Sequence, residues 1–160
     1  MEPGQDWKIA ALTSNKRVCF FVGDNMDKYM EMAIKLAKKA YKHDDVPVGA
    51  VIISHNKVIS KAYNKKFVKN DVTAHAEILA LQKACKKKKT TYLNDCTIYI
   101  TLEPCTMCAD AIKQAHINTI IYCAESPKYG ALHLNNSFNV KKIESDEYVK
   151  LLKKFFADKR

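Results

Sequence analysis

The sequence predicts an α/β protein, a three-layer α/β/α sandwich around a central mixed sheet of about five strands. Three observations support this fold class. The 160 residues with 48% hydrophobic content suit one domain with a buried core. Apolar residues recur at three- and four-residue steps in some segments and form short continuous runs in others. Two strand–helix–strand passages follow one another, which indicates crossover connections over a sheet that helices cover.

The N-terminal half predicts a helix and a hairpin. From Met26 onward, apolar residues repeat along one helix face and lysines occupy the other, until residues 44–47 end the helix at a proline. Residues 49–54 and 58–63 are two short apolar runs joined by three polar residues, which predicts a β-hairpin. A polar loop over residues 64–72 follows.

The remaining elements alternate. Residues 74–87 predict a helix with a buried face, and residues 96–102 predict a strand that ends before Pro104. A short helix at 105–115 and a strand at 118–123 come next, and then a turn-rich stretch at 126–139. The last helix, 145–159, starts at a serine whose hydroxyl can cap its first turn. Residues 1–24 show no sustained period and are expected to be an N-terminal extension of unknown role, and residues 25–160 a single domain.

Composition narrows the class of partner. The formal net charge of +10 favours a polyanionic partner, although 25 of the 27 basic residues are lysines, as a lysine-biased genome would also produce. The longest apolar run is far too short to span a membrane, and no secretory signal is visible. We therefore expect a cytoplasmic protein with no membrane partner, in which the six cysteines are metal ligands, core residues or catalytic groups.

Two short motifs carry the chemistry: residues 73–77 (TAHAE) and 103–108 (EPCTMC). Cys105 and Cys108, spaced Cys-x-x-Cys at the start of a predicted helix, share one helix face and suit zinc. The pair alone also fits a redox dithiol or half of a structural zinc site. His75 adds a third ligand. Zinc with three protein ligands keeps an open fourth position, which distinguishes a catalytic site from a structural one.

Glu77 is the expected proton carrier of such a site. Residues two positions apart on a helix are separated by about 200° around its axis. His75 and Glu77 can therefore face one metal ion only if the helix points its first turn at that ion. Two helix N-termini would then converge and favour negative charge there. A closed structural zinc remains an alternative, with one of six further side chains as its fourth ligand: His43, His55, His116, His133, Cys85 or Cys96.

The paired His-Ala-Glu and Pro-Cys-x-x-Cys motifs resemble those of the zinc-dependent, cytidine-deaminase-like superfamily. From about residue 26 to residue 160 the chain is similar, more narrowly, to the bacterial-type tRNA-specific adenosine deaminase family. The matching stretches are residues 46–51 (VPVGAV), 63–64 (YN), 73–78 (TAHAEI), 101–105 (TLEPC), 128–131 (KYGA) and 151–156 (LLKKFF).

The resemblance implies a cytidine-deaminase-like fold in residues 25–160 and a homodimer. Its activity would be the conversion of adenosine to inosine at the wobble position of a tRNA anticodon. It implies one catalytic Zn²⁺ held by His75, Cys105 and Cys108, with Glu77 as the catalytic residue. It also implies a set of substrate-binding residues: Asn64, which would contact the base, and Val46, Pro47, Val48 and Ala74.

Two other functions fit the same residues. One is a deaminase of a free base or nucleoside, guanine or cytosine, with the same zinc site. The other is a non-catalytic RNA-binding subunit that keeps zinc for structure. The chain also departs from the family in the short loop 132–139 and in residues 125–127 (ESP), which begin with Glu125 and stand where the family often has Arg-Asp-Ala. An acidic residue there is expected to repel phosphate.

Overall fold

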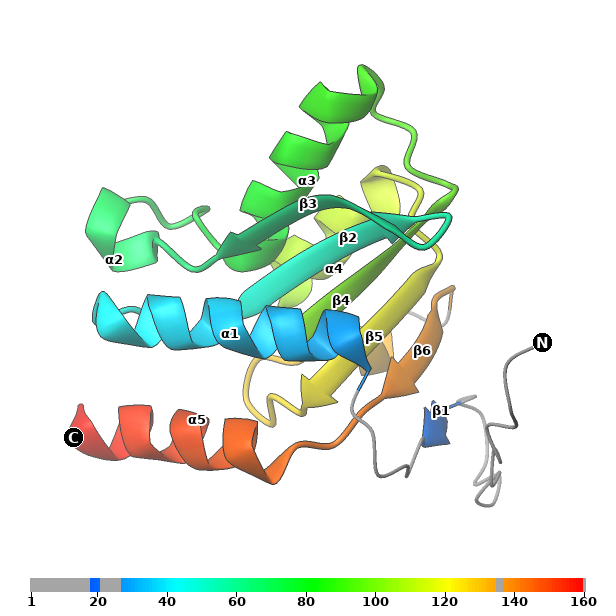
Figure 1. Ribbon diagram of the computed structural model, residues 1–160. Helices are drawn as coiled ribbons and strands as arrows, with labels where there is room; N and C mark the ends of the chain where they lie inside the picture. The colour runs from blue at the N-terminus through cyan, green and yellow to red at the C-terminus, as the bar shows by residue number, and fades with distance from the viewer. Residues whose placement is uncertain (1–17, 21–26, 135–136, 160) are drawn as a thin grey trace.

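The computed structural model describes residues 18–20, 27–134 and 137–159, and its central sheet has helices on both faces (Figure 1). The predicted three-layer α/β/α class is confirmed. Within the described residues the sheet has six strands in the order β1-β6-β5-β4-β2-β3, where the sequence indicated about five. The elements, in chain order, are β1 (Val18–Phe20), α1 (Lys28–Lys42), β2 (Gly49–Ser54), β3 (Lys57–Tyr63), α2 (Lys66–Lys69), α3 (Ala76–Lys88), β4 (Cys96–Leu102), α4 (Thr106–Gln114), β5 (Thr119–Ala124), the 3₁₀ turn η1 (Leu132–Leu134), β6 (Asn139–Lys142) and α5 (Asp146–Asp158).

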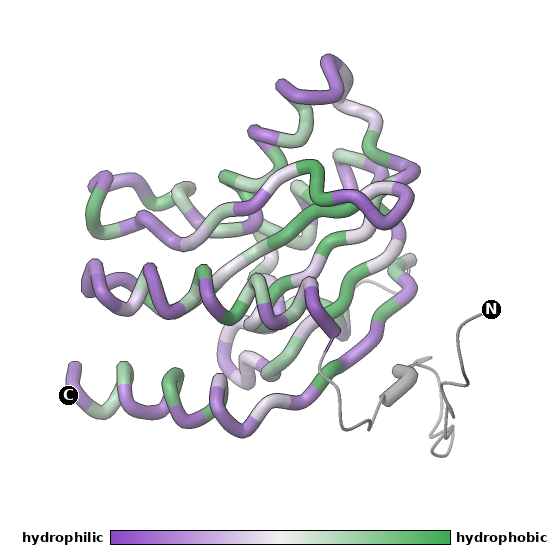
Figure 2. The backbone as a smooth tube through the Cα atoms, viewed as in Figure 1, coloured by the Kyte–Doolittle hydropathy of each residue, from purple (hydrophilic) through white to green (hydrophobic). Residues whose placement is uncertain are grey.

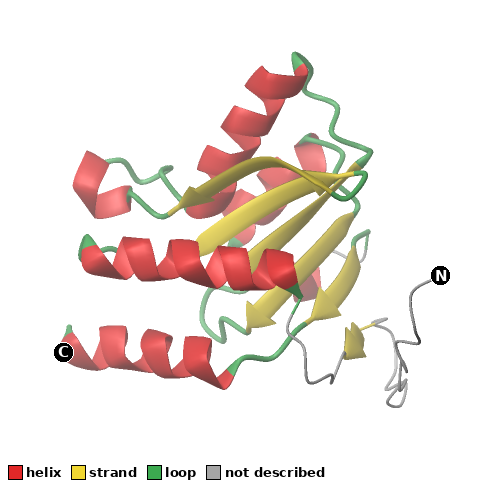
Figure 3. Ribbon diagram, in the orientation of Figure 1, coloured by secondary structure: helices red, strands yellow, loops and turns green. Residues whose placement is uncertain are grey.

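The sheet is mixed, as predicted. Strand β2 pairs antiparallel with both β3 and β4, whereas β4, β5, β6 and β1 run parallel to one another. Because β4 and β5 are parallel and adjacent, α4 must cross over between them (Figure 3). Helix α3 leads into the start of β4 and α4 follows its end, so the N-termini of α3 and α4 can lie at the same edge of the sheet.

Two apolar clusters separate the three layers. Ile52 and Ile98 pack against α3 and α4 on one face, and Val51 and Tyr99 pack against α1 on the other. Neighbouring residues point to opposite faces because side chains alternate along a strand. The central strands are therefore apolar on both sides, which Figure 2 shows as the green interior of the molecule. None of the helices that the structure describes is long and apolar enough to cross a membrane.

The sequence missed three short elements. Strand β6 begins where a turn-rich stretch was expected to end, and its sequence, NVKK, has little apolar content. Its backbone pairs with β5 and β1, so pairing partners rather than side chains define it. Strand β1 lies inside the segment expected to be an extension, and α2 lies in the expected polar loop. The other residues of 1–24 lie outside the described part of the chain.

Side-chain caps fix the starts of the two helices on the α1 face. The Asp27 carboxylate accepts the backbone N–H of Tyr29 at 2.8 Å at the start of α1. The Ser145 hydroxyl accepts the backbone N–H of Tyr148 at 3.3 Å at the start of α5, which confirms the predicted cap. Each cap satisfies a donor that the first helical turn leaves without a partner.

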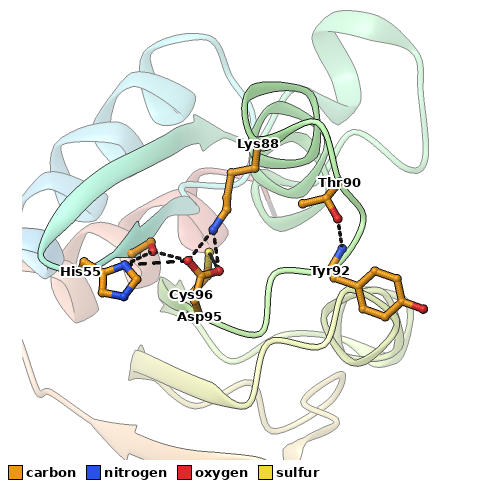
Figure 4. A network of polar contacts seen from close by, with 7 residues as sticks. His55, Lys88, Thr90, Tyr92, Asp95 and Cys96 are labelled. Carbon is orange, nitrogen blue, oxygen red and sulfur yellow. Dashed lines mark hydrogen bonds and ion pairs between the residues drawn. The ribbon is translucent and has the colours of Figure 1, made fainter.

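A polar network ties the far end of α3 to the sheet (Figure 4). The Asp95 carboxylate, just before β4, accepts the ammonium of Lys88 and, at 2.6 Å, the hydroxyl of Ser54. These two contacts hold the pKa of Asp95 well below its usual range, first because of Lys88 and then because of Ser54. The His55 Nδ1 lies 2.9 Å from the same hydroxyl. The C-terminal end of α3 is therefore fixed to the β2–β3 hairpin.

Candidate active site

His75, Cys105 and Cys108 come together as a group that could hold a metal ion. Their ligand atoms all lie within 4.8 Å of one another. The His75 Nδ1 is 3.8 Å from the Cys105 Sγ and 3.5 Å from the Cys108 Sγ. Bond lengths of about 2.0 Å to nitrogen and 2.3 Å to sulfur in a tetrahedral zinc site place such atoms about 3.6 Å apart. Both the donor set and its spacing therefore fit zinc.

Two helix starts bring these side chains to one place. His75 is the N-cap residue of α3 and Cys105 is the N-cap residue of α4, and both have extended backbone. Neither side chain makes a capping hydrogen bond, so both stay available to a ligand. Cys108 lies one turn into α4 and is buried. The convergence of two helix N-termini, which the motifs predicted, places the positive ends of two helix dipoles at this point.

The six side chains considered as a closing fourth ligand do not join this group. Among the described residues, the metal-binding group contains His75, Cys105 and Cys108 and none of the six: His43, His55, His116, His133, Cys85 and Cys96. Cys96, for example, lies near the opposite end of α3, where its Sγ is 3.6 Å from the Asp95 carboxylate. The three-residue group therefore leaves room for a fourth, exogenous ligand.

Glu77 lies in the first turn of α3 and is 4% exposed. Among the described residues, its Oε2 is the one buried side-chain oxygen or nitrogen without a hydrogen-bond partner. Burial raises the pKa of Glu77 to about 7, against smaller opposing contributions from its backbone and from His75. A buried carboxylate oxygen without a partner costs stability, and the Glu77 Oε2 is available to a ligand or a proton.

The two thiols differ in acidity. The hydrogen bond from Cys108, followed by that from His75, lowers the pKa of Cys105 to about 4 although burial opposes this. The pKa of Cys108 is raised well above its ordinary value, first by the neighbouring Cys105 and then by burial. The hydrogen bond to Cys105 raises the pKa of His75. The pair thus carries a thiolate that is ready to bind a cation.

Asn64 is 5% exposed and holds the start of α3 in place. Its side-chain Oδ1 accepts the backbone N–H of Ala76 at 2.7 Å, and its backbone N–H donates to the Val48 carbonyl at 3.1 Å. These two hydrogen bonds join the end of β3 to the segment before β2 and to the start of α3. The bond to Ala76 gives Asn64 a structural role that the sequence did not predict, and its contact with a base stays a prediction.

The other expected substrate-binding residues lie between α1 and β2 (Val46, Pro47 and Val48) and between α2 and α3 (Ala74). Pro47 and Val48 are buried and Val46 is partly buried, and the Pro47 carbonyl accepts the hydroxyl of Tyr148 at 2.9 Å. Ala74 is buried directly before His75, and its carbonyl accepts the backbone N–H of Lys65 at 2.9 Å. The fold thus brings them towards the first turn of α3, and their role in substrate binding remains a prediction.

Glu103 lies near the site and belongs to the second motif, but the sequence analysis assigned it no role. Its carboxylate accepts the backbone N–H groups of Ser126, at 3.1 Å, and Leu132, at 3.3 Å, from the loop after β5. A Cβ atom on Gly130 would lie 2.2 Å from the Glu103 Oε2, so the loop presses directly on this carboxylate. Its position two residues before Cys105, in an otherwise apolar strand end, was the available signal.

Glu125 is not an isolated negative charge. Its carboxylate lies 3.2 Å from the ammonium of Lys142 on β6, which also contacts Glu144 at 3.5 Å. Because Lys142 is shared by two exposed carboxylates, the three side chains keep one net negative charge, and the repulsion of phosphate stays a prediction.

Known proteins that are similar to this chain are deaminases. A family model described as MafB19-like deaminase matches residues 24–160. The tRNA-specific adenosine deaminase of Agrobacterium fabrum is 37% identical over 143 residues, which cover 82% of this chain and 94% of the relative. The corresponding Aquifex aeolicus protein is 41% identical over 104 residues, which cover 65% of this chain and 69% of the relative.

Two solved structures resemble this chain at equal sequence identity. One, from a study of A-to-I editing by tRNA:A34 deaminases at the wobble position, superposes with a TM-score of 0.67 at 37% identity, covering 73% of this chain and 96% of that one. The other, a guanine deaminase from Bacillus subtilis, has a TM-score of 0.60 at 37% identity and covers 63% of this chain and 65% of that one.

Proposed function

Because this chain belongs to the MafB19-like deaminase family and to the family of tRNA-specific adenosine deaminases, we propose that it deaminates adenosine to inosine at the wobble position of a tRNA anticodon. The reaction consumes water and releases ammonia. The proposal rests above all on the Glu77 Oε2, a buried oxygen without a partner beside a His/Cys/Cys group. A purely structural metal site has no use for such an oxygen.

His75, Cys105 and Cys108 would hold one Zn²⁺ through the Nδ1 and the two Sγ atoms. Zinc bound there would supply an activated water at neutral pH. The two converging helix N-termini favour the negative charge that develops in this space as the purine ring is attacked. The set of residues thus combines a ligand group with an electrostatically prepared environment.

Glu77 would move the protons of the reaction. Its Oε2 would take one proton from the attacking water and deliver it to the purine ring nitrogen. It would then carry the second proton of that water to the amino group, which leaves as ammonia. The carboxylate is held in the first turn of α3, two residues from His75. The target base must leave its stack to enter the site, and an anticodon loop presents its bases already splayed.

Asn64 offers a direct test of base contact. Asn64→Asp keeps an oxygen to accept the Ala76 N–H but removes the side-chain amide donor, whereas Asn64→Ala removes both. If the amide contacts the base, Asn64→Asp should retain its melting temperature and raise KM for RNA by about tenfold or more, while Asn64→Ala loses about 1–3 kcal/mol of stability as well. Thermal unfolding and steady-state kinetics measure the two effects. Normal kinetics in Asn64→Asp would leave Asn64 with its structural role alone.

Deamination of a free base is the second candidate, favoured by the similarity to the Bacillus subtilis guanine deaminase. Zinc-loaded protein is incubated with tRNA that carries adenosine at the wobble position and, in parallel, with free adenosine, guanine and cytosine. Inosine confined to the wobble base is the expected result, and its yield should fall steeply as salt rises. Ammonia released only from a free base, with no salt dependence, would replace the RNA substrate by that base.

The family membership also supports a homodimer that works in the cytoplasm, where tRNA is found. Sedimentation of the purified protein at several concentrations tests the homodimer, and the expected mass is that of two chains.

A further inference from the structure

The loop of residues 65–74, called here the α2 loop, leaves the candidate site and returns to it. It begins directly after Asn64 and ends directly before His75. The backbone N–H of Lys65 donates to the Ala74 carbonyl at 2.9 Å and closes its neck. In Figure 1 the loop, with its short helix α2, projects from the sheet beside the end of α1. The neck of this loop therefore adjoins the candidate site.

The α2 loop is held in one shape. Asp45 is fully buried, and its Oδ2 accepts the backbone N–H of Phe67 at 2.9 Å. Asn70 has a left-handed backbone with a φ of 49°, which turns the chain back after α2. The Asp71 carboxylate accepts both the backbone N–H and the hydroxyl of Thr73, at 2.8 and 2.7 Å. The loop is thus built by specific contacts at its base, at its turn and at its return.

This fixed loop exposes apolar side chains. Phe67, Val68 and Val72 are 55%, 58% and 72% exposed, and they are three of the seven large hydrophobic side chains that the described residues expose. No side chain of α2 is buried. A loop that is held rigidly while it turns apolar groups outward indicates a surface that another molecule covers.

The charge around these apolar groups is positive. Lys65, Lys66 and Lys69 belong to the loop, and the ammonium of Lys66 lies over the Phe67 ring at 5.4 Å from its centroid. Lys83 on α3 lies near them, and its ammonium donates to the carbonyl of Lys61 on β3 at 3.0 Å. Partial burial, and then the neighbouring Lys65, Lys69 and Lys61, lower the pKa of Lys83, so these charges lie close enough to repel one another.

Positive charge and an exposed aromatic ring select the partner. A second copy of this chain that presented the same lysines across a two-fold axis would be repelled. Single-stranded RNA satisfies both features, since its phosphates pair with lysines and its bases stack on aromatic rings in a sequence-tolerant way. We propose that the α2 loop binds the RNA strand next to the target nucleotide, with Lys65 and Lys69 at its phosphates and Phe67 stacked on a flanking base. This inference rests on the proposed RNA substrate.

Binding of a tRNA with wobble adenosine tests the inference through two variants of the full-length, zinc-loaded protein. Lys65→Glu/Lys69→Glu should raise Kd about tenfold or more and flatten the dependence of log Kd on log salt. Phe67→Ala should raise Kd roughly 5- to 100-fold while leaving the salt slope unchanged, because it removes stacking and no charge. The matched control is Lys35→Glu/Lys39→Glu, which makes the same charge change at two exposed positions of α1 and should alter Kd by less than about threefold.

Melting temperature, zinc content and sedimentation are measured on each variant, since the substituted side chains are exposed or half-buried and the fold should tolerate them. Loop variants that bind tRNA as the wild type does would overturn the inference, and so would a control variant that weakens binding as much as they do. Variants that dissociate a dimer at unchanged Kd would assign the loop to contacts between copies. Failure of the wild type to form inosine in tRNA would instead reject the proposed function, which separates the two results.

Discussion

Glu77→Ala is expected to keep the fold and the bound zinc and to lose deamination by about 10²–10⁴-fold, the usual effect of removing a general acid–base. The carboxylate is not part of the ligand group, so metal content should stay at the wild-type level. Single-turnover inosine formation in tRNA measures the loss, and metal analysis of the same sample shows that zinc is retained.

Stability separates a proton carrier from a structural carboxylate in this variant. Because the Glu77 Oε2 is buried without a hydrogen-bond partner, its removal should leave the melting temperature unchanged or raise it. Glu31→Ala is the matched control, since Glu31 also lies in the first turn of a helix but is exposed on α1. It should turn over normally. Wild-type turnover in Glu77→Ala would remove Glu77 from proton transfer, and a large fall in its melting temperature would make it a structural group.

Cys105→Ser should lose most of the bound zinc and, with it, all measurable deamination. A hydroxyl remains protonated at neutral pH and is a far poorer zinc ligand than the thiolate that the lowered pKa of Cys105 provides. Zinc per chain, measured on protein purified in zinc-containing buffer, gives the first readout, and inosine formation gives the second.

Cys85→Ser serves as the control for this change, because Cys85 is a free, partly buried cysteine outside the ligand group. It should keep its zinc and its activity. Treatment of the wild type with a chelator is expected to reproduce the Cys105→Ser result, and added zinc should restore activity only in the wild type. Full zinc occupancy in Cys105→Ser would exclude Cys105 from the ligand set.

Local spacing explains why much of the fold and the ligand group could be predicted from the sequence. Cys105 and Cys108 are three residues apart at a helix start, and this spacing alone places them on one side of the first turn. The segments with helical periodicity and the apolar strands likewise predicted the three-layer class, since core-facing residues repeat at 3.6 or 2 positions. Strand β6 gave no such signal, because backbone pairing with β5 defines it and its side chains are mostly polar.

The sequence by itself determined which residues could chemically form the site: His75, Glu77 and the two cysteines, with their positions along two helices. Only the tertiary structure decided how they are used. The Glu77 Oε2 is buried without a hydrogen-bond partner. The Asn64 Oδ1 accepts the backbone N–H of Ala76, and the Asp45 carboxylate accepts a backbone N–H of the α2 loop. The physical reason is that burial and hydrogen-bond pairing depend on segments that meet in space, whereas helix and strand periodicity is written in neighbouring residues.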